Sequence, residues 1–196
     1  MGRRKIWEEN KKIRSVRLRT VTGQKTSFTN VNRAARQKKI QKVKEKALTS
    51  TDIISLLRNC DNFLGVFASD ELSSVRVLQT PAFLISNLDV RSGSGTHWIC
   101  LRIGKSTIEI FDSLGFDRIL WGSFPSGLHK FLKRYKLSHS FFVSPIIQPN
   151  FTSDCGLYCV YFALYRQFKT FKDCLSPFRR LLTKNHFRLI KLLKSL

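Results

Sequence analysis

The chain has 196 residues, of which 42% are hydrophobic, and a formal net charge of +22 at pH 7. This length suits one ordinary domain with an additional tail, and no apolar run approaches the roughly 20 residues of a membrane-spanning helix. The large positive charge indicates a polyanionic partner, with nucleic acid expected before an anionic membrane surface. We find no signal-peptide segment, which favours an intracellular protein whose five cysteines stay thiols. Four scattered histidines and no CxxC or CxxH pair predict that there is no metal site.

Residues 1–48 form a basic segment with few apolar side chains. They contain 16 Lys/Arg and three Glu, so they cannot bury enough surface to offset the entropy lost on ordering. We therefore predict a mainly disordered tail whose basic clusters bind nucleic acid or direct nuclear import, a generic solubilising tail being the alternative. The residues expected to contact nucleic acid are Arg3, Arg4, Lys5, Lys38, Lys39 and Lys42.

A folded domain is predicted over residues 49–196. Its expected elements, in chain order, are a helix capped by Ser50 or Thr51 and ending at Leu57, an extended segment over 75–86, strands over 97–103 and 106–112, a helix around 124–135, a strand around 140–143, a helix beginning near Cys155, and a basic amphipathic segment over 178–196.

The two strands over 97–103 and 106–112 are separated by Gly104 and Lys105. Glycine at the first central position of a two-residue loop is typical of a type II′ hairpin turn. In that turn residue 103 faces residue 106, so the numbers of facing residues sum to 209. The sequence thus predicts an antiparallel hairpin with a defined register.

This register predicts that His97 faces Asp112 at the end of the hairpin. Side chains alternate across a strand, so both lie on a face of aliphatic residues, with Cβ atoms about 4.5–5.5 Å apart. A slip of one residue would move Asp112 to the other face. That other face is expected to be mixed and half-exposed: Trp98, Cys100, Arg102, Thr107, Glu109 and Phe111. A His–Asp pair can be purely structural, but a cysteine downstream favours catalysis.

That cysteine, Cys155, precedes an apolar, helix-length run over 159–168. A helix N-terminus carries partial positive charge, which favours the thiolate. We expect Cys155 to be the nucleophile, His97 the general base and acid, and Asp112 the group that orients His97. The Gln148 side-chain amide and nearby backbone N–H groups are expected to stabilise the oxyanion, while Gly156 keeps the first helical turn free of bulk beside the substrate.

The other cysteines and histidines fit this chemistry less well. Cys159 is expected in the core, one turn further along the same helix. No histidine with matching geometry is expected near the remaining cysteines, Cys60, Cys100 and Cys174. The remaining histidines lie in basic or loop contexts and are expected at the surface: His129, His139 and His186.

These residues resemble the adenain (adenovirus protease) and ubiquitin-like-protease clan of cysteine peptidases, whose chain order is His, Asp/Glu, Gln, Cys. The segments 96–98 (THW) and 110–116 (IFDSLGF) resemble those that carry the clan's histidine and acid. The seven-residue step from Gln148 to Cys155, and Phe63-Leu64-Gly65-Val66, resemble the adenovirus protease. By contrast, Asp154-Cys155-Gly156 and an Asp as the acid resemble the SUMO-deconjugating branch, whose Gln sits one residue closer.

The resemblance implies an α+β, papain-like fold in permuted order, with a central helix packed on a mixed β-sheet. It implies a monomeric thiol protease of a DNA virus or virus-like element that cleaves viral precursor proteins at Gly-containing sites during virion maturation, in the host nucleus and the virion. It places Trp98 beside the catalytic His97, near the substrate. No cofactor is needed for the chemistry and no membrane is involved, but DNA is expected as an activator. The resemblance also implies a peptide activator joined through a disulfide, but here Leu137 stands where the linking cysteine would be.

Two alternatives stay open. One is a deconjugase that removes SUMO or other ubiquitin-like modifiers, although a charge of +22 favours nucleic acid over acidic modifiers. The other is a catalytically silent, basic nucleic-acid-binding protein on an enzyme-like scaffold. A complete set of four catalytic residue types argues against the latter.

Overall fold

The computed structural model describes residues 47–115 and 125–195. The predicted basic tail, including its six expected nucleic-acid contacts, lies outside these residues except for Ala47 and Leu48. None of the helices in the described ranges is long and apolar enough to cross a membrane.

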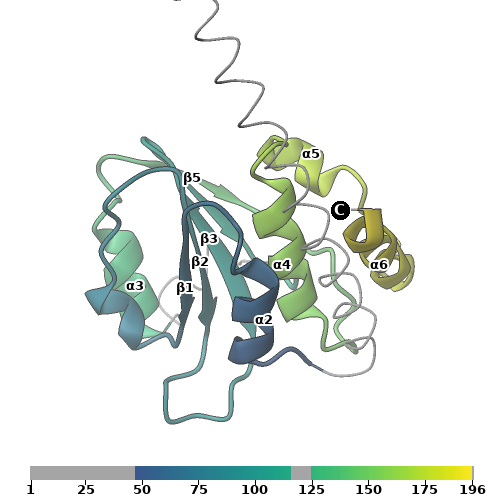
Figure 1. Cartoon of the computed structure of the whole chain (residues 1–196), viewed down its shortest axis with the longest axis horizontal. Coiled ribbons are helices and arrows are strands. Elements are labelled where there is room, and N and C mark those ends of the chain that lie inside the picture. Colours follow the sequence, from purple (N-terminus) through teal and green to yellow (C-terminus); the bar gives the residue numbers. More distant parts are fainter. Residues whose placement is uncertain (1–46, 116–124, 196) are drawn as a thin grey trace, which may run out of the picture. The chain divides into compact units, whose positions relative to one another are not determined.

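A five-stranded mixed sheet forms the centre of the domain (Figure 1). Its strands are β1 (Phe63–Phe67), β2 (Ala82–Asn87), β3 (Trp98–Ile103), β4 (Thr107–Phe111) and β5 (Ser140–Val143). They lie in sequence order. The central strands β2, β3 and β4 are antiparallel, whereas β1 and β5 join the two edges in parallel. The predicted strand around 140–143 is confirmed, and the extended segment over 75–86 is a strand only from Ala82 onward.

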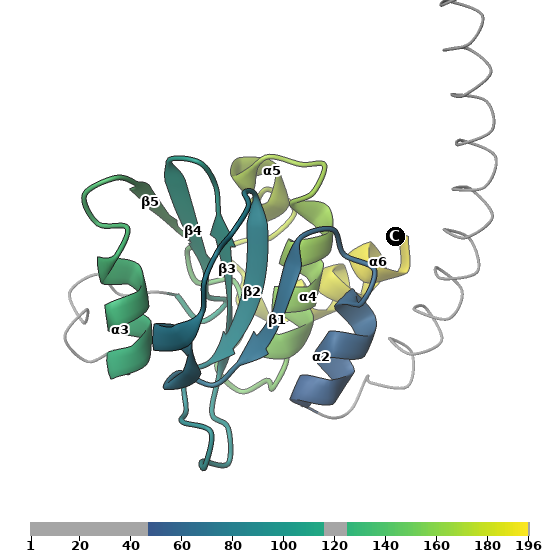
Figure 2. The same cartoon turned by 60° about the vertical axis from the view of Figure 1, so that its left-hand side comes forward.

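Helices cover both faces of this sheet. They are α2 (Ser50–Leu57), α3 (Ser126–Lys133), α4 (Cys155–Tyr165), α5 (Phe171–Leu175) and α6 (Asn185–Ser195), with 3-10 turns at Glu71–Ser74 and Leu182–Lys184. Figures 1 and 2 show α3 on one side of the sheet and α4 on the other, with α6 beyond α4. The cap of α2 is Thr49, one residue before the predicted Ser50 or Thr51, because Thr49 and Asp52 form a reciprocal capping box.

The central helix is α4, which is buried from Cys155 to Leu164. Phe162 on this helix stacks on Phe111 of β4 with ring centroids 4.4 Å apart. A fully buried large apolar side chain contributes about 1.5–3 kcal/mol, so this contact holds α4 firmly on the sheet. The prediction of an α+β fold with a central helix on a mixed sheet is confirmed.

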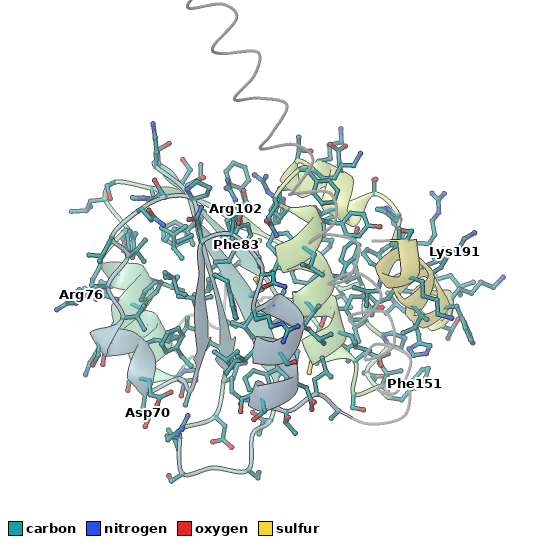
Figure 3. The ribbon with its side chains drawn as sticks, in the orientation of Figure 1. Asp70, Arg76, Phe83, Arg102, Phe151 and Lys191 are labelled. Atoms are coloured by element: carbon teal, nitrogen blue, oxygen red, sulfur yellow. The ribbon has the colours of Figure 1, made fainter. Side chains whose placement is uncertain are left out.

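The face of β3 and β4 beneath α4 is more buried than the sequence predicts. Cys100 and Phe111 are fully buried, and Glu109 is 3% exposed. Glu109 accepts hydrogen bonds from Arg166, at the end of α4, and from Arg102 at 3.1 Å, and Arg102 lies over the Phe83 ring (Figure 3). These charges offset one another where burial alone would be costly, and they attach the C-terminal end of α4 to the sheet.

The hairpin between β3 and β4 forms, but its register differs from the predicted one by two residues. Leu101 pairs with Ile110 and Ile103 with Ile108, so facing numbers sum to 211. Gly104 does not occupy a central turn position: its N–H donates to the Thr107 carbonyl at 2.7 Å, which closes the loop around Lys105 and residue 106. Gly104 also lacks the positive φ that the first position of a type II′ turn requires.

Candidate active site

His97 and Asp112 lie at the same end of the hairpin and bind one another. His97 immediately precedes β3 and Asp112 immediately follows β4. The two residues are not directly opposed in the ladder, yet His97 Nε2 is 2.7 Å from Asp112 Oδ1. Their side chains are only 12% and 7% exposed, so the contact is shielded from water. The structure brings the predicted pair together by a diagonal contact.

The backbone around Asp112 fixes its carboxylate. The Leu114 N–H donates to Oδ1 at 2.9 Å, the same oxygen that contacts His97. The Ser144 hydroxyl accepts from the Asp112 N–H at 2.8 Å and donates to the Asp112 carbonyl at 2.7 Å. With both backbone groups and one carboxylate oxygen held, Asp112 presents a fixed acceptor to the imidazole.

Cys155 is the first residue of α4 and lies beside His97, and 8% of the Cys155 surface is exposed. Burial by itself disfavours a charged imidazole. The hydrogen bonds and charges of Asp112 and Cys155 outweigh that effect and raise the pKa of His97 to about 9. Because Nε2 faces Asp112, the other ring nitrogen, Nδ1, is left for Cys155. At neutral pH the arrangement therefore holds a proton on His97, next to the sulfur.

Gln148 is fixed in the same region with 1% of its surface exposed. The Ser113 hydroxyl donates to Gln148 Oε1 at 2.6 Å, and Nε2 donates to the Thr152 carbonyl at 2.7 Å. The Ser113 carbonyl also accepts the N–H groups of Gln148 and Ile147, at 2.8 and 2.9 Å. An amide NH₂ has two N–H donors, of which Thr152 takes one, so the second N–H is available to an oxyanion.

Trp98 and Gly156 pack together at the start of α4, and Leu48 completes the contact. The Trp98 indole N–H donates to the Leu48 carbonyl at 3.0 Å, so this N–H is engaged within the chain. A Cβ built on Gly156 would lie 2.9 Å from Leu48 Cβ and 3.3 Å from Trp98 Cδ1. A side chain at position 156 is thus opposed by the packing of Leu48 and Trp98, a reason that differs from the predicted one, which was room beside the substrate.

A second His–Asp pair adjoins Cys155. His186 Nδ1 is 2.7 Å from Oδ2 of Asp154, the residue immediately before Cys155, and the two side chains are 27% and 13% exposed. The expectation that His186 has a surface role is wrong, because α6 brings it against the start of α4. His139 is also engaged, with Ser138 and with the Gly104 carbonyl.

The remaining cysteines lie apart from this chemistry. All five cysteines are buried thiols. Burial raises the thiol pKa of Cys159 and of Cys100 well above the ordinary value, and Cys159 Sγ donates to the Trp98 carbonyl at 3.3 Å. No group of three metal-ligating side chains gathers within residues 47–115 and 125–195.

Four residues that support the site were not singled out from the sequence: Leu48, Ser113, Ser144 and His186. Each acts through one hydrogen bond or packing contact with a partner at least 32 residues away. No local spacing rule reports such contacts. Ser113 lies in the segment 110–116, but the resemblance of that segment to the clan's acid-bearing segment gives Ser113 no role of its own.

The chain matches a family model over more than half of its length. This model, described as adenovirus endoprotease, matches residues 63–184. Among solved structures, the chain is similar to the C-terminal Ulp1 protease domain in complex with Smt3, the yeast ortholog of SUMO. The identity is 17%, the match covers 79% of this chain and 81% of that one, and the TM-score is 0.40. No curated protein matches the chain.

Proposed function

The chain belongs to the adenovirus endoprotease family and is a cysteine endopeptidase, and we propose that it cleaves viral precursor proteins at Gly-containing sites during virion maturation. The observation that carries the catalytic part is the 2.7 Å contact between His97 and Asp112, together with the raised pKa of His97, to which Cys155 contributes. The cleavage sites and the viral setting follow from the family resemblance, which supplies protein substrates and a viral context.

In this proposal the Cys155 thiolate attacks the carbonyl carbon of the scissile bond. The tetrahedral oxyanion collapses to a thioester as the C–N bond breaks, and His97 gives its proton to the departing amine. Water, deprotonated by His97, then attacks the thioester carbon. The C–S bond breaks, the acid product leaves, and the Cys155 thiolate and the protonated His97 are restored. Asp112 keeps the imidazole oriented throughout and stabilises its charged form.

The second N–H of the Gln148 amide and the N–H groups at the start of α4 stabilise the oxyanion. The first N–H groups of a helix have no partner within the helix, and they carry the positive end of its dipole. Removing a single donor of this kind costs about 10²–10³ in kcat, so Gln148→Ala should lose that much. Trp98 and Gly156 shape the surface next to the sulfur.

DNA is proposed as the polyanion that holds enzyme and substrates together. The formal charge of +22 supports this, as do the basic clusters in residues 1–46. The corresponding locations are the host nucleus and the virion. Cys155 and its partners need no further cofactor. A peptide activator would have to join by a route other than a disulfide at Leu137.

The test is hydrolysis of a fluorogenic peptide ending in Leu-Arg-Gly-Gly, with and without DNA, at two salt concentrations. Cys155→Ala is the blank and should abolish hydrolysis. Activity that rises with DNA and falls with salt supports the proposal. Wild-type turnover by Cys155→Ala would remove Cys155 from the role of nucleophile. A complete absence of hydrolysis, with DNA present, would favour the catalytically silent scaffold.

The second candidate is the removal of SUMO- or ubiquitin-like modifiers. The specific feature that favours it is the Asp154-Cys155-Gly156 step, together with an Asp as the acid. A deconjugase would hydrolyse the same peptide without regard to DNA, and would prefer a folded modifier with a C-terminal extension. Cleavage of folded modifiers far above that of unfolded Gly-containing peptides would favour this candidate.

A further inference from the structure

The contact between His186 and Asp154 links the last helix to the residue that precedes the nucleophile. The two atoms are 2.7 Å apart, while the residues are 32 positions apart in the chain. The helix α6 begins at Asn185, just beyond the residues 63–184 that the family model matches. This contact is therefore a feature of the chain's own C-terminal helix.

Asp154 does not behave as a residue at its position usually does. An Asp at a helix N-cap normally has extended backbone angles and accepts hydrogen bonds from the first N–H groups of the helix. Asp154 has ψ 0° and its side chain makes no capping hydrogen bond. His186 holds the carboxylate instead. The Asp154 carboxylate therefore does not bind the N–H groups beside Cys155, where it would compete with an oxyanion.

The neighbouring residue of α6 holds the other side of the site. Asn185 is fully buried, and its Nδ2 donates to the Ile147 carbonyl at 2.8 Å and to the Arg179 carbonyl at 2.9 Å. Ile147 directly precedes Gln148, and the Tyr158 hydroxyl of α4 reaches the same carbonyl at 3.3 Å. The start of α6 thus contacts both segments that supply oxyanion donors.

We propose that His186 is a positioning residue that, through Asp154, keeps the N-terminal N–H groups of α4 open to the oxyanion and fixes the backbone on which Cys155 stands. Asn185 braces the Gln148 segment from the same helix. The inference rests on the proposed peptidase mechanism for its kinetic effect, but the geometry around Cys155 can be measured without turnover.

The experiment compares His186→Ala with His186→Asn in the full-length chain. An asparagine amide can place an N–H close to the position of Nδ1, so it should restore the hydrogen bond to Asp154. Lys191→Ala is the matched control, because Lys191 also lies on α6 and its side chain is exposed. The readouts are kcat and KM on the fluorogenic peptide, the alkylation rate of Cys155 by iodoacetamide, and the melting temperature.

We expect His186→Ala to lower kcat about three- to tenfold with little change in KM, since one hydrogen bond of ordinary strength is lost. The alkylation rate of Cys155 should change in the same variant. His186→Asn should return both values to within about twofold of wild type, and Lys191→Ala should alter neither. In an Asp154→Ala background, His186→Ala should have no further effect.

Three results would overturn the proposal. The first is an unchanged kcat and alkylation rate in His186→Ala. The second is a fall in kcat that tracks the melting temperature and is not rescued by asparagine, which would make the contact purely stabilising. The third is that the losses in kcat caused by His186→Ala and by Asp154→Ala add fully when the two substitutions are combined. If the wild-type protein hydrolyses no peptide, but His186→Ala still changes the alkylation rate of Cys155, the proposed function fails and the positioning role stands.

Discussion

Ser113 connects the proposed catalytic acid, Asp112, to the proposed oxyanion donor, Gln148. It follows Asp112 in the chain and is fully buried, and its hydroxyl donates to Gln148 Oε1 at 2.6 Å. The Thr152 carbonyl can only accept, so the Gln148 amide turns its NH₂ group toward Thr152 and its oxygen toward Ser113, whose hydroxyl donates to it. Without the Ser113 hydroxyl one of these two contacts is lost, and the amide is held less firmly in the orientation that directs its second N–H to the developing oxyanion.

We therefore predict that Ser113→Ala lowers kcat about three- to tenfold and leaves KM nearly unchanged, because one orienting hydrogen bond is lost. Steady-state kinetics on the fluorogenic peptide measure this effect. Ser69→Ala is the matched control, since Ser69 is equally buried and its hydroxyl has no partner within the described residues. In Gln148→Ala the Ser113 substitution should cost nothing more, and an equal loss in both backgrounds would contradict the assignment.

A second prediction concerns the proton on His97. Its pKa is raised to about 9, so the imidazole stays charged between pH 6.5 and 9. It therefore contributes stability that is fully present below pH 6.5 and is lost as the pH rises through 9. Titration of the His97 ring by NMR should show a midpoint near 9 in wild type and a lower one in Cys155→Ala, where one hydrogen bond and one charge are removed. A wild-type midpoint near 6.5 would refute it.

The contact between His97 and Asp112 could be predicted from the sequence, even though the register of the hairpin could not. Side chains alternate with period two, so an error of two residues keeps both on the same side of the hairpin. The error itself arose at Gly104, which flanks the turn instead of occupying it. The contacts of Ser113 and His186 were beyond reach, because they depend on how distant segments pack.

At the scale of elements, the N-terminus of α4 is packed more tightly than a helix end needs to be. Leu48 is 5% exposed and lies against both Gly156 and Trp98, so the chain entering α2 touches the helix that carries Cys155. The sequence assigns Leu48 to the tail because its neighbours are basic. Only the fold reveals that its side chain belongs to the domain.

This packing predicts the sign of Gly156→Ala. In an exposed helix the change stabilises by about 1 kcal/mol, because glycine is a poor helix former. Here the new Cβ would lie 2.9 Å from Leu48 Cβ, which is close to the backbone and cannot simply rotate away. We expect a net loss of about 1–3 kcal/mol in the free energy of unfolding, measured by urea denaturation. A gain in stability would mean that Leu48 does not occupy this position.

At the scale of the whole molecule, the positive charge is unevenly distributed. Residues 1–46 carry 16 Lys/Arg and three Glu, and residues 178–195 carry six Lys/Arg and no Asp or Glu. Five of those six basic residues are exposed, and Lys191 projects outward from α6 in Figure 3. The basic C-terminal segment that the sequence predicts is therefore a charged outer surface on a helix whose first residues contact the active site.

If this surface binds DNA, a single charge reversal there should act differently from one on the far side of the domain. Lys191→Glu should weaken DNA binding several-fold and make log Kd less dependent on log[salt], by roughly 0.9 for each lost phosphate contact. Arg76→Glu is the matched control, because Arg76 is also exposed but lies on the opposite side in Figure 3. Both variants change the net charge by the same amount, so a purely nonspecific attraction predicts equal effects. Fluorescence anisotropy with a short duplex at several salt concentrations separates the two outcomes, and equal slopes would assign DNA binding to the molecule's total charge and not to α6.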